Sequence, residues 1–167
     1  MRKLLFVFAF LMATVAANAQ FEQGKWLINT SVTGLDLSFA GSSNNDLGTK
    51  NHFGFDAEGG YFLKDNLALI GTLGGDWRSG ADLYKIGAKA RYYFDKVGFY
   101  AGGGLLVRSL QINHGKDTTD FAFTLEGGYT YFLSRTVAIE PALYYDISVK
   151  DSDWSRFGLK LGFSFYF

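Results

Sequence analysis

The strongest constraint on the fold is the alternation of side chains in residues 156–167. They read Arg-Phe-Gly-Leu-Lys-Leu-Gly-Phe-Ser-Phe-Tyr-Phe, with an apolar residue at every odd position and a polar residue, glycine or tyrosine at every even one. Because successive side chains of a β-strand point to opposite faces, the pattern predicts one strand with an apolar face. A tilted strand crosses a bilayer in about 9–11 residues, so this strand is long enough to span one.

The same alternation recurs along the chain and predicts eight strands. They cover residues 25–39, 53–63, 67–78, 84–94, 97–110, 121–133, 137–149 and 156–167. Tight turns are expected at 64–66, 95–96 and 134–136, and longer polar loops at 40–51, 79–82, 113–120 and 150–155. Short turns at one end and longer loops at the other are typical of a transmembrane barrel. The predicted fold is therefore all-β, an eight-stranded antiparallel up-and-down transmembrane β-barrel.

Two positions should disturb the strand ladders. The alternation of the first strand shifts by one residue at Gly34, which predicts a bulge or kink there. Pro141 lies within the strand 137–149, and proline cannot donate a ladder hydrogen bond. A closed barrel has no edge strand to accommodate it, so we expect a second bulge near Pro141.

Residues 1–19 have the features of a secretory signal peptide. Arg2 and Lys3 precede an apolar run, and Ala17-Asn18-Ala19 forms a small-x-small cleavage site. We expect residues 20–167 to form one barrel domain. Without Arg2 and Lys3 this domain has 14 basic and 16 acidic residues, which argues against nucleic-acid binding. The sequence contains no cysteine, so we expect no disulfide, thiolate metal site or lipoprotein anchor.

The apolar face is expected to point outward. The interior of an eight-stranded barrel is only wide enough to be filled by side chains, and this large apolar set would overfill it. Aromatic residues gather near the strand ends, as in the girdles that border a lipid-facing band. These are Phe53, Trp77, Tyr84, Phe121 and Phe157 near the loops, and Tyr61, Phe94, Tyr131 and Phe165 near the tight turns. The alternative is a soluble lipid-binding barrel with an apolar interior.

The inward face would then carry a balanced set of charges. Buried charges must be paired or hydrogen-bonded, so we predict a network of salt bridges that fills the lumen. A narrow porin-like channel is the alternative, although rings of one sign would favour it more than a balanced set does. The predicted network consists of Asp56, Glu58, Asp76, Arg78, Lys85, Lys89, Arg91, Arg108, Glu126, Glu140, Asp146, Arg156 and Lys160.

The C-terminal residues carry a family resemblance. The segment from Lys160 through Gly162 and Phe165 to Phe167 resembles the terminal insertion signal of bacterial outer-membrane barrels, which the barrel-assembly machinery reads. In pattern, residues 20–167 resemble the small eight-stranded barrels of the OmpA/OmpX type. The resemblance implies a monomer in the outer membrane of a Gram-negative bacterium, with outer-membrane lipid and the assembly machinery as partners. It also implies a filled interior. We expect no cofactor, and a structural or loop-mediated interaction role.

Catalysis is the remaining alternative, because some small outer-membrane barrels modify lipid A. A nucleophilic site needs serine, histidine and an orienting acid held together. The two histidines, His52 and His114, fall beside or within predicted loops, and neither begins a His-x-Ser sequence. We therefore expect no enzyme activity. Clustered histidine and cysteine ligands for a metal are also missing from the sequence.

The signal-peptide assignment can be tested directly. Protein isolated from outer membranes should begin at Gln20, because the small residues at 17 and 19 suit signal peptidase. N-terminal sequencing or intact mass measurement gives the answer, and a retained Met1 would contradict the assignment.

Overall fold

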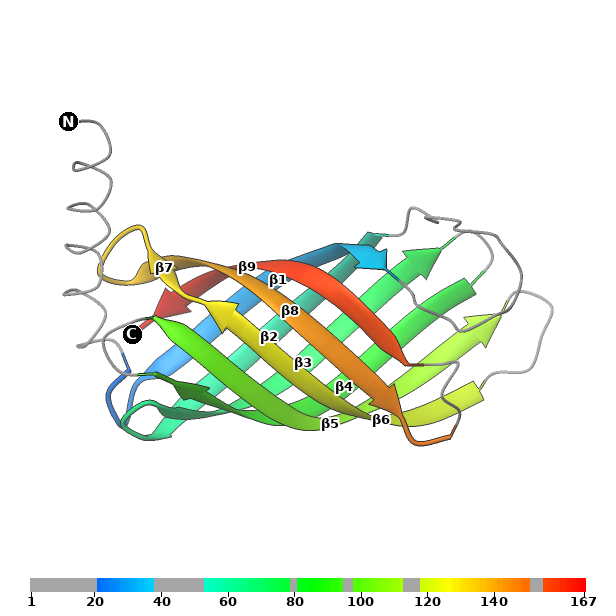
Figure 1. Cartoon of the computed structure of the whole chain (residues 1–167), viewed down its shortest axis with the longest axis horizontal. Coiled ribbons are helices and arrows are strands. Elements are labelled where there is room, and N and C mark those ends of the chain that lie inside the picture. Colours follow the sequence, from blue (N-terminus) through cyan, green and yellow to red (C-terminus); the bar gives the residue numbers. More distant parts are fainter. Residues whose placement is uncertain (1–20, 38–52, 79–80, 95–97, 113–117, 151–154) are drawn as a thin grey trace.

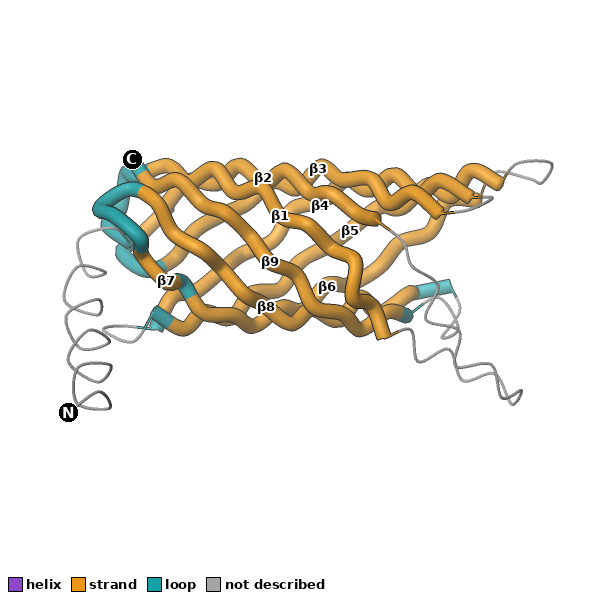
Figure 2. Tube along the Cα trace, turned by 90° about the horizontal axis from the view of Figure 1, so that it is seen from above, coloured by secondary structure: helices purple, strands orange, loops and turns teal. Residues whose placement is uncertain are grey.

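A computed structural model describes residues 21–37, 53–78, 81–94, 98–112, 118–150 and 155–167. Its strands wrap into a single barrel, and the turns at 64–66 and 134–136 lie at the same end as the C-terminus (Figures 1 and 2). No helix within these ranges is long and apolar enough to cross a membrane. The strands are β1 (Trp26–Leu37), β2 (Phe53–Lys64), β3 (Leu67–Arg78), β4 (Ala81–Tyr93), β5 (Phe99–Ile112), β6 (Thr118–Tyr129), β7 (Tyr131–Phe132), β8 (Val137–Ser148) and β9 (Arg156–Tyr166).

The strand order confirms the predicted barrel. The hydrogen-bonded order is β6-β5-β4-β3-β2-β1-β9-β8-β7, and β6 also pairs with β8, which closes the sheet. Both β6 and β7 pair with β8, so they are two parts of the same barrel strand. All pairings are antiparallel, and the closed barrel therefore has eight strands.

The two expected irregularities differ in outcome. Gly34 forms the predicted bulge: Thr33 pairs with Lys160 and Leu35 with Leu159, which leaves Gly34 as the extra residue. The expectation of a bulge near Pro141 is wrong. Gly128 pairs with Ala142 and Tyr131 with Ile139, so both strands advance equally and no residue is inserted.

Pro141 instead interrupts the ladder, and this interruption separates β6 from β7. Proline has no N–H to donate toward the neighbouring strand. On that strand, the N–H of Thr130 donates to the carbonyl oxygen of Gly98 on the opposite side, at 2.8 Å. Gly98 has a φ of +78°, a conformation that glycine adopts without steric cost. The barrel therefore accommodates proline by losing a ladder contact and keeping its register.

The orientation of the two faces is as predicted. Large apolar side chains are exposed on the outer face, for example Leu73 at 60% and Phe121 at 62%. Charged residues on the opposite parity, such as Glu58 and Arg91, are buried in the lumen. Among the predicted girdle residues, Tyr61, Phe94, Tyr131, Phe165, Tyr84 and Phe121 are exposed and Phe157 is half-buried, while the side chains of Phe53 and Trp77 lie outside the described set.

Two strands extend further into the predicted loops than expected. Residues 81–82 belong to β4, and residues 118–120 belong to β6. Ala81 of β4 pairs with Ile112 of β5, and Thr118 of β6 pairs with Leu110 of β5, so both ladders continue into the predicted loops. As a result Asp120, which the sequence placed in a loop, is an inward-facing strand residue.

Adjacent glycines in β6 provide a matched test of interior packing. A Cβ atom on Gly128 would lie 2.5 Å from Cζ of Tyr100 and 2.7 Å from the carbonyl oxygen of Pro141. On Gly127, the nearest atom to a new Cβ would be 3.9 Å away. We expect Gly128→Ala to lower the free energy of unfolding by about 1–3 kcal/mol, as overpacking usually does. Gly127→Ala should change it by less than about 0.5 kcal/mol.

Urea titration of the refolded barrels measures both variants. Equal midpoints for Gly128→Ala and Gly127→Ala would contradict the close contact with Tyr100.

Candidate functional site

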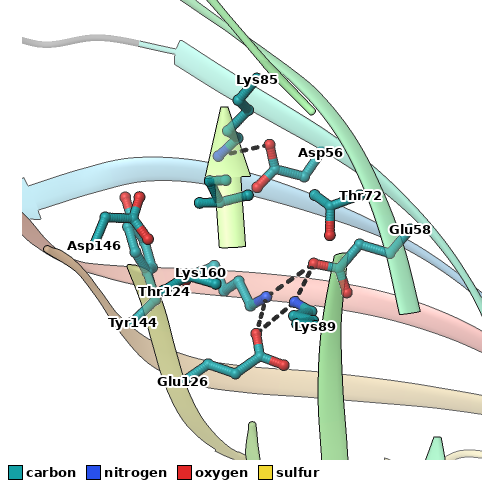
Figure 3. Close-up of a pocket in the computed structure, with 11 residues that line it drawn as sticks. Asp56, Glu58, Thr72, Lys85, Lys89, Thr124, Glu126, Tyr144, Asp146 and Lys160 are labelled. Carbon is teal, nitrogen blue, oxygen red and sulfur yellow. Dashed lines mark hydrogen bonds and ion pairs between the residues drawn. The ribbon is translucent and has the colours of Figure 1, made fainter. Parts of the chain in front are cut away.

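The middle of the lumen is crossed by six buried charged side chains. Three are carboxylates and three are cations, and they come from five strands. We call this set the central charge layer; it consists of Glu58 in β2, Lys89 and Arg91 in β4, Glu126 in β6, Glu140 in β8 and Lys160 in β9. Figure 3 shows four of these residues beside the cavity described below, with the ammonium groups of Lys89 and Lys160 lying between the carboxylates of Glu58 and Glu126.

Both lysines bridge the same two glutamates. Lys89 Nζ is 2.6 Å from Glu58 Oε1 and 2.6 Å from Glu126 Oε2. Lys160 Nζ is 3.1 Å from Glu58 Oε1 and 2.6 Å from Glu126 Oε2. Each ammonium has three donors, so these two carboxylate contacts use two of them in this buried region.

Arg91 joins all three carboxylates of the central charge layer. Its Nε donates to Glu126 Oε1 at 2.7 Å, its Nη2 to Glu58 Oε2 at 3.0 Å and its Nη1 to Glu140 Oε2 at 3.0 Å. The planar guanidinium presents its donors in a fixed fork, which suits several carboxylates at once. Arg91 is completely buried, so these contacts replace the water that a charged group would otherwise require.

Neutral polar side chains complete the bonding of Glu140. Asn29 Nδ2 donates to Glu140 Oε2 at 3.0 Å, and Thr130 Oγ1 donates to Oε1 at 3.1 Å. The hydroxyl of Tyr166 also donates to Oε1. Sequence reasoning did not single out these partners, although Asn29 and Tyr166 both stand on the inward parity of their strands.

The lumen between the central charge layer and the turn at 64–66 is apolar, so the predicted salt bridges fill only part of the lumen. Bulky inward residues such as Phe62 and Tyr93 are fully buried there. We call this cluster the aromatic cap; it consists of Phe21, Leu27, Phe62, Ala68, Ile70, Tyr93, Tyr100, Phe132, Ala138, Ala142 and Tyr166. Phe62, Ile70 and Phe132 are apolar residues at inward-facing positions of their strands. This departure from the apolar–polar alternation could have predicted the aromatic cap.

Tyrosine hydroxyls join the aromatic cap to the central charge layer. The hydroxyls of Tyr93 and Tyr166 lie 3.2 Å apart, and Arg91 Nη1 donates to Tyr93 at 3.2 Å. The guanidinium carbon of Arg91 also lies 4.2 Å from the centre of the Tyr100 ring, within cation–π range. The apolar and charged parts of the lumen are thus one continuous packed interior.

Toward the loops, the remaining charges form separate pairs. Lys85 Nζ lies 2.8 Å from Asp56 Oδ1, and Arg156 Nη1 lies 3.3 Å from Asp76 Oδ2. Arg108 pairs with Asp120, which also accepts a hydrogen bond from Ser148.

The structure therefore brings most of the predicted charged residues together in the lumen, as one layer and several pairs. Asp146 is buried, and its Oδ1 atom has no hydrogen-bond partner in the described part of the chain. The side chain of Arg78 lies outside the described set.

A small cavity separates the central charge layer from the pair of Lys85 and Asp56. Its volume is about 20 Å³, and its lining includes Thr72, Thr124 and Leu106 (Figure 3). A space of this size holds about one water molecule. Leu106 is an apolar residue on the inward parity of β5. A Cβ atom on Gly87, which faces it, would meet the Leu106 side chain. Leu106 therefore fills the space that Gly87 leaves.

The four residues of the predicted insertion signal divide between the two faces. Lys160 and Gly162 face the lumen, whereas Phe165 and Phe167 are exposed on the outside. A Cβ atom on Gly162 would lie 2.6 Å from Asn29 Nδ2, the donor to Glu140. Lumen packing therefore accounts for Lys160 and Gly162, and only the two phenylalanines have no packing role inside the barrel.

His52 and His114, the candidate bases of the catalytic alternative, both lie outside the described residues. Within the described ranges, no group of three or more His, Cys, Asp or Glu side chains is arranged to hold a metal ion.

Gly162→Ala and Phe167→Ala should separate packing from recognition. Alanine at 162 crowds Asn29, so we expect the refolded barrel to lose about 1–3 kcal/mol of unfolding free energy in detergent. Alanine at 167 removes an outward ring, so refolding in detergent should remain near normal while assembly in cells falls. Heat-modifiable gel migration measures assembled barrel in both settings. Normal levels of assembled Phe167→Ala in cells would contradict a recognition role.

Several solved structures share this architecture. Solved structures with the same fold include the N-terminal β-barrel domain of Pseudomonas aeruginosa OprF, with 16% identity and a TM-score of 0.67, and Neisserial surface protein A, with 18% identity and a TM-score of 0.66. Each alignment covers 87% of this chain and 98% of the other. Ail of Yersinia pestis, in a phospholipid bilayer nanodisc, has 13% identity and a TM-score of 0.58, with 87% and 100% covered.

No curated protein matches the sequence significantly. Residues 5–167 match the family of outer membrane protein beta-barrel domains. The chain therefore belongs to the outer membrane protein beta-barrel domain family, which places it in the outer membrane of a Gram-negative bacterium.

Proposed function

We propose that the protein is a closed, non-conducting barrel whose role in the outer membrane is structural or carried by its loops. The observation that carries this proposal is the set of direct bonds across the lumen. In the ring of strands, β2 lies four positions from β6, and β4 lies four positions from β9. These are opposite walls of an eight-stranded barrel. Glu58, Lys89, Glu126 and Lys160 thus reach inward from every second strand, with alternating sign.

The contacts among these four residues support a lumen that is closed to ions at this level. All four contacts between the lysines and the glutamates are between 2.6 and 3.1 Å. An ion could pass only by separating buried charges, which is costly where water is excluded. The cavity next to the layer is about 20 Å³, and the aromatic cap occupies the lumen on the other side. These features support a filled lumen over a porin-like channel.

We also propose that the protein is not an enzyme. The described lumen contains carboxylates, lysines and arginines that neutralise each other, and their contacts leave no nucleophile–base pair of the triad type among them. Lipid A from cells with and without the gene should have the same acylation pattern by mass spectrometry. A difference that disappears with His114→Ala would contradict this proposal.

The closed lumen can be tested by electrical recording. The purified protein in planar bilayers should show no stable single-channel conductance, because the bonded layer must break before ions pass. A general porin reconstituted in the same bilayers serves as the positive control. Reproducible, ion-selective steps from the folded protein would refute the closed barrel and favour the narrow channel.

A further inference from the structure

Phe21 lies inside the barrel although it belongs to no strand. It precedes β1 and is only 4% exposed. Its ring stacks on Tyr93, with a centroid separation of 4.1 Å and an interplanar angle of 21°. It meets the ring of Tyr166 edge-on at 5.7 Å, and the rings of Phe62 and Phe132 at 6.0 and 5.7 Å. Rings from four different strands therefore form a cradle around Phe21.

Backbone hydrogen bonds hold this segment in the mouth of the barrel. Asn66 N donates to the carbonyl oxygen of Phe21 at 2.7 Å, and Gln23 N donates to Asp65 Oδ1 at 2.8 Å. Gly24, with a φ of +89°, donates to the carbonyl oxygen of Phe62 at 3.0 Å. The turn between β2 and β3 thus anchors the segment, and the left-handed turn at Gly24 leads the chain from the cradle into β1.

We propose that residues 21–24 form a plug that closes the tight-turn mouth of the lumen, which is the periplasmic end in bacterial barrels. Among the described cap residues, Phe21 is the only one that no strand contributes. Its ring can leave while every strand pairing stays intact, so the plug is a displaceable part of the lumen filling. The proposal deepens the proposed function, on which it rests: the lumen has two seals in series, the plug and the central charge layer.

Tyr93 connects the plug to the central charge layer. Phe21 stacks on the Tyr93 ring, and the hydroxyl of Tyr93 accepts a hydrogen bond from Arg91 and contacts Tyr166. Removing Phe21 therefore exposes the cradle toward the periplasm and removes packing from a ring that supports the central charge layer.

Cysteine accessibility tests the plug, because the chain has no cysteine of its own. Ala138 is a fully buried member of the aromatic cap, paired with Phe132. In a barrel that keeps Phe21, Ala138→Cys should resist a membrane-impermeant maleimide. Adding Phe21→Ala should raise its labelling rate at least tenfold. Gln23→Ala, in the same segment, should leave the rate unchanged because the ring and the backbone bonds remain.

Two further cysteines localise the effect. Thr136→Cys, in the exposed turn after β7, should react in every background. Ala122→Cys is buried in the half of the lumen nearer the loops and should stay protected with or without Phe21. Heat-modifiable migration confirms folding of each variant, and if Phe21→Ala does not fold, Phe21→Leu and Phe21→Val should give a graded rise in Ala138→Cys labelling.

Labelling at position 138 that does not depend on the residue at 21 would overturn the plug. So would a rise at 122 equal to that at 138, because it would indicate opening of the whole barrel. The two proposals can be refuted independently. Conductance by the unchanged protein would refute the closed lumen, whereas the labelling experiment tests only the plug at the mouth.

Discussion

The pairing of charges in the central layer is the constraint on which the rest of the lumen depends. Glu58 and Glu126 face each other across the barrel, and each is bound by Lys89, Lys160 and Arg91. Burying any one of these charges without a partner would cost several kcal/mol of desolvation free energy. Removing one partner from a buried pair typically destabilises a protein by about 3–5 kcal/mol. The layer is therefore stable only as a complete set, which requires the correct register around the whole barrel.

The aromatic cap has a different physical basis and solves a different problem. Apolar burial is non-directional, so rings can fill the narrow end of the lumen without exact partners. Tyrosine provides the transition between the two regions because it has an apolar ring and a polar hydroxyl. Tyr166 shows this best: its ring contacts Phe21 and Phe132, while its hydroxyl donates to Glu140.

Glycines set how closely the strands and side chains of the lumen can approach. A Cβ atom on Gly74 would meet the carboxylate of Asp56, and one on Gly104 would meet the backbone of Ala88 and Lys89. Gly162, which has no side chain, leaves the space that the Asn29 side chain occupies when it donates to Glu140. At Gly74 and Gly162 glycine therefore makes room for inward side chains, and at Gly104 it lets two backbones approach closely.

The sequence by itself determined the strands, the outward apolar face and the inward parity of the charges, because a two-residue period can be read locally. Only the tertiary structure decided which charges meet, since β2 and β6 lie on opposite walls and their contact depends on the register of every strand between them. The register of β5 against β6 places Asp120 beside Arg108. The unshifted register on β8 shows that Pro141 breaks a ladder without a bulge. Phe21 follows no strand period, so only the folded barrel could place its ring among four others.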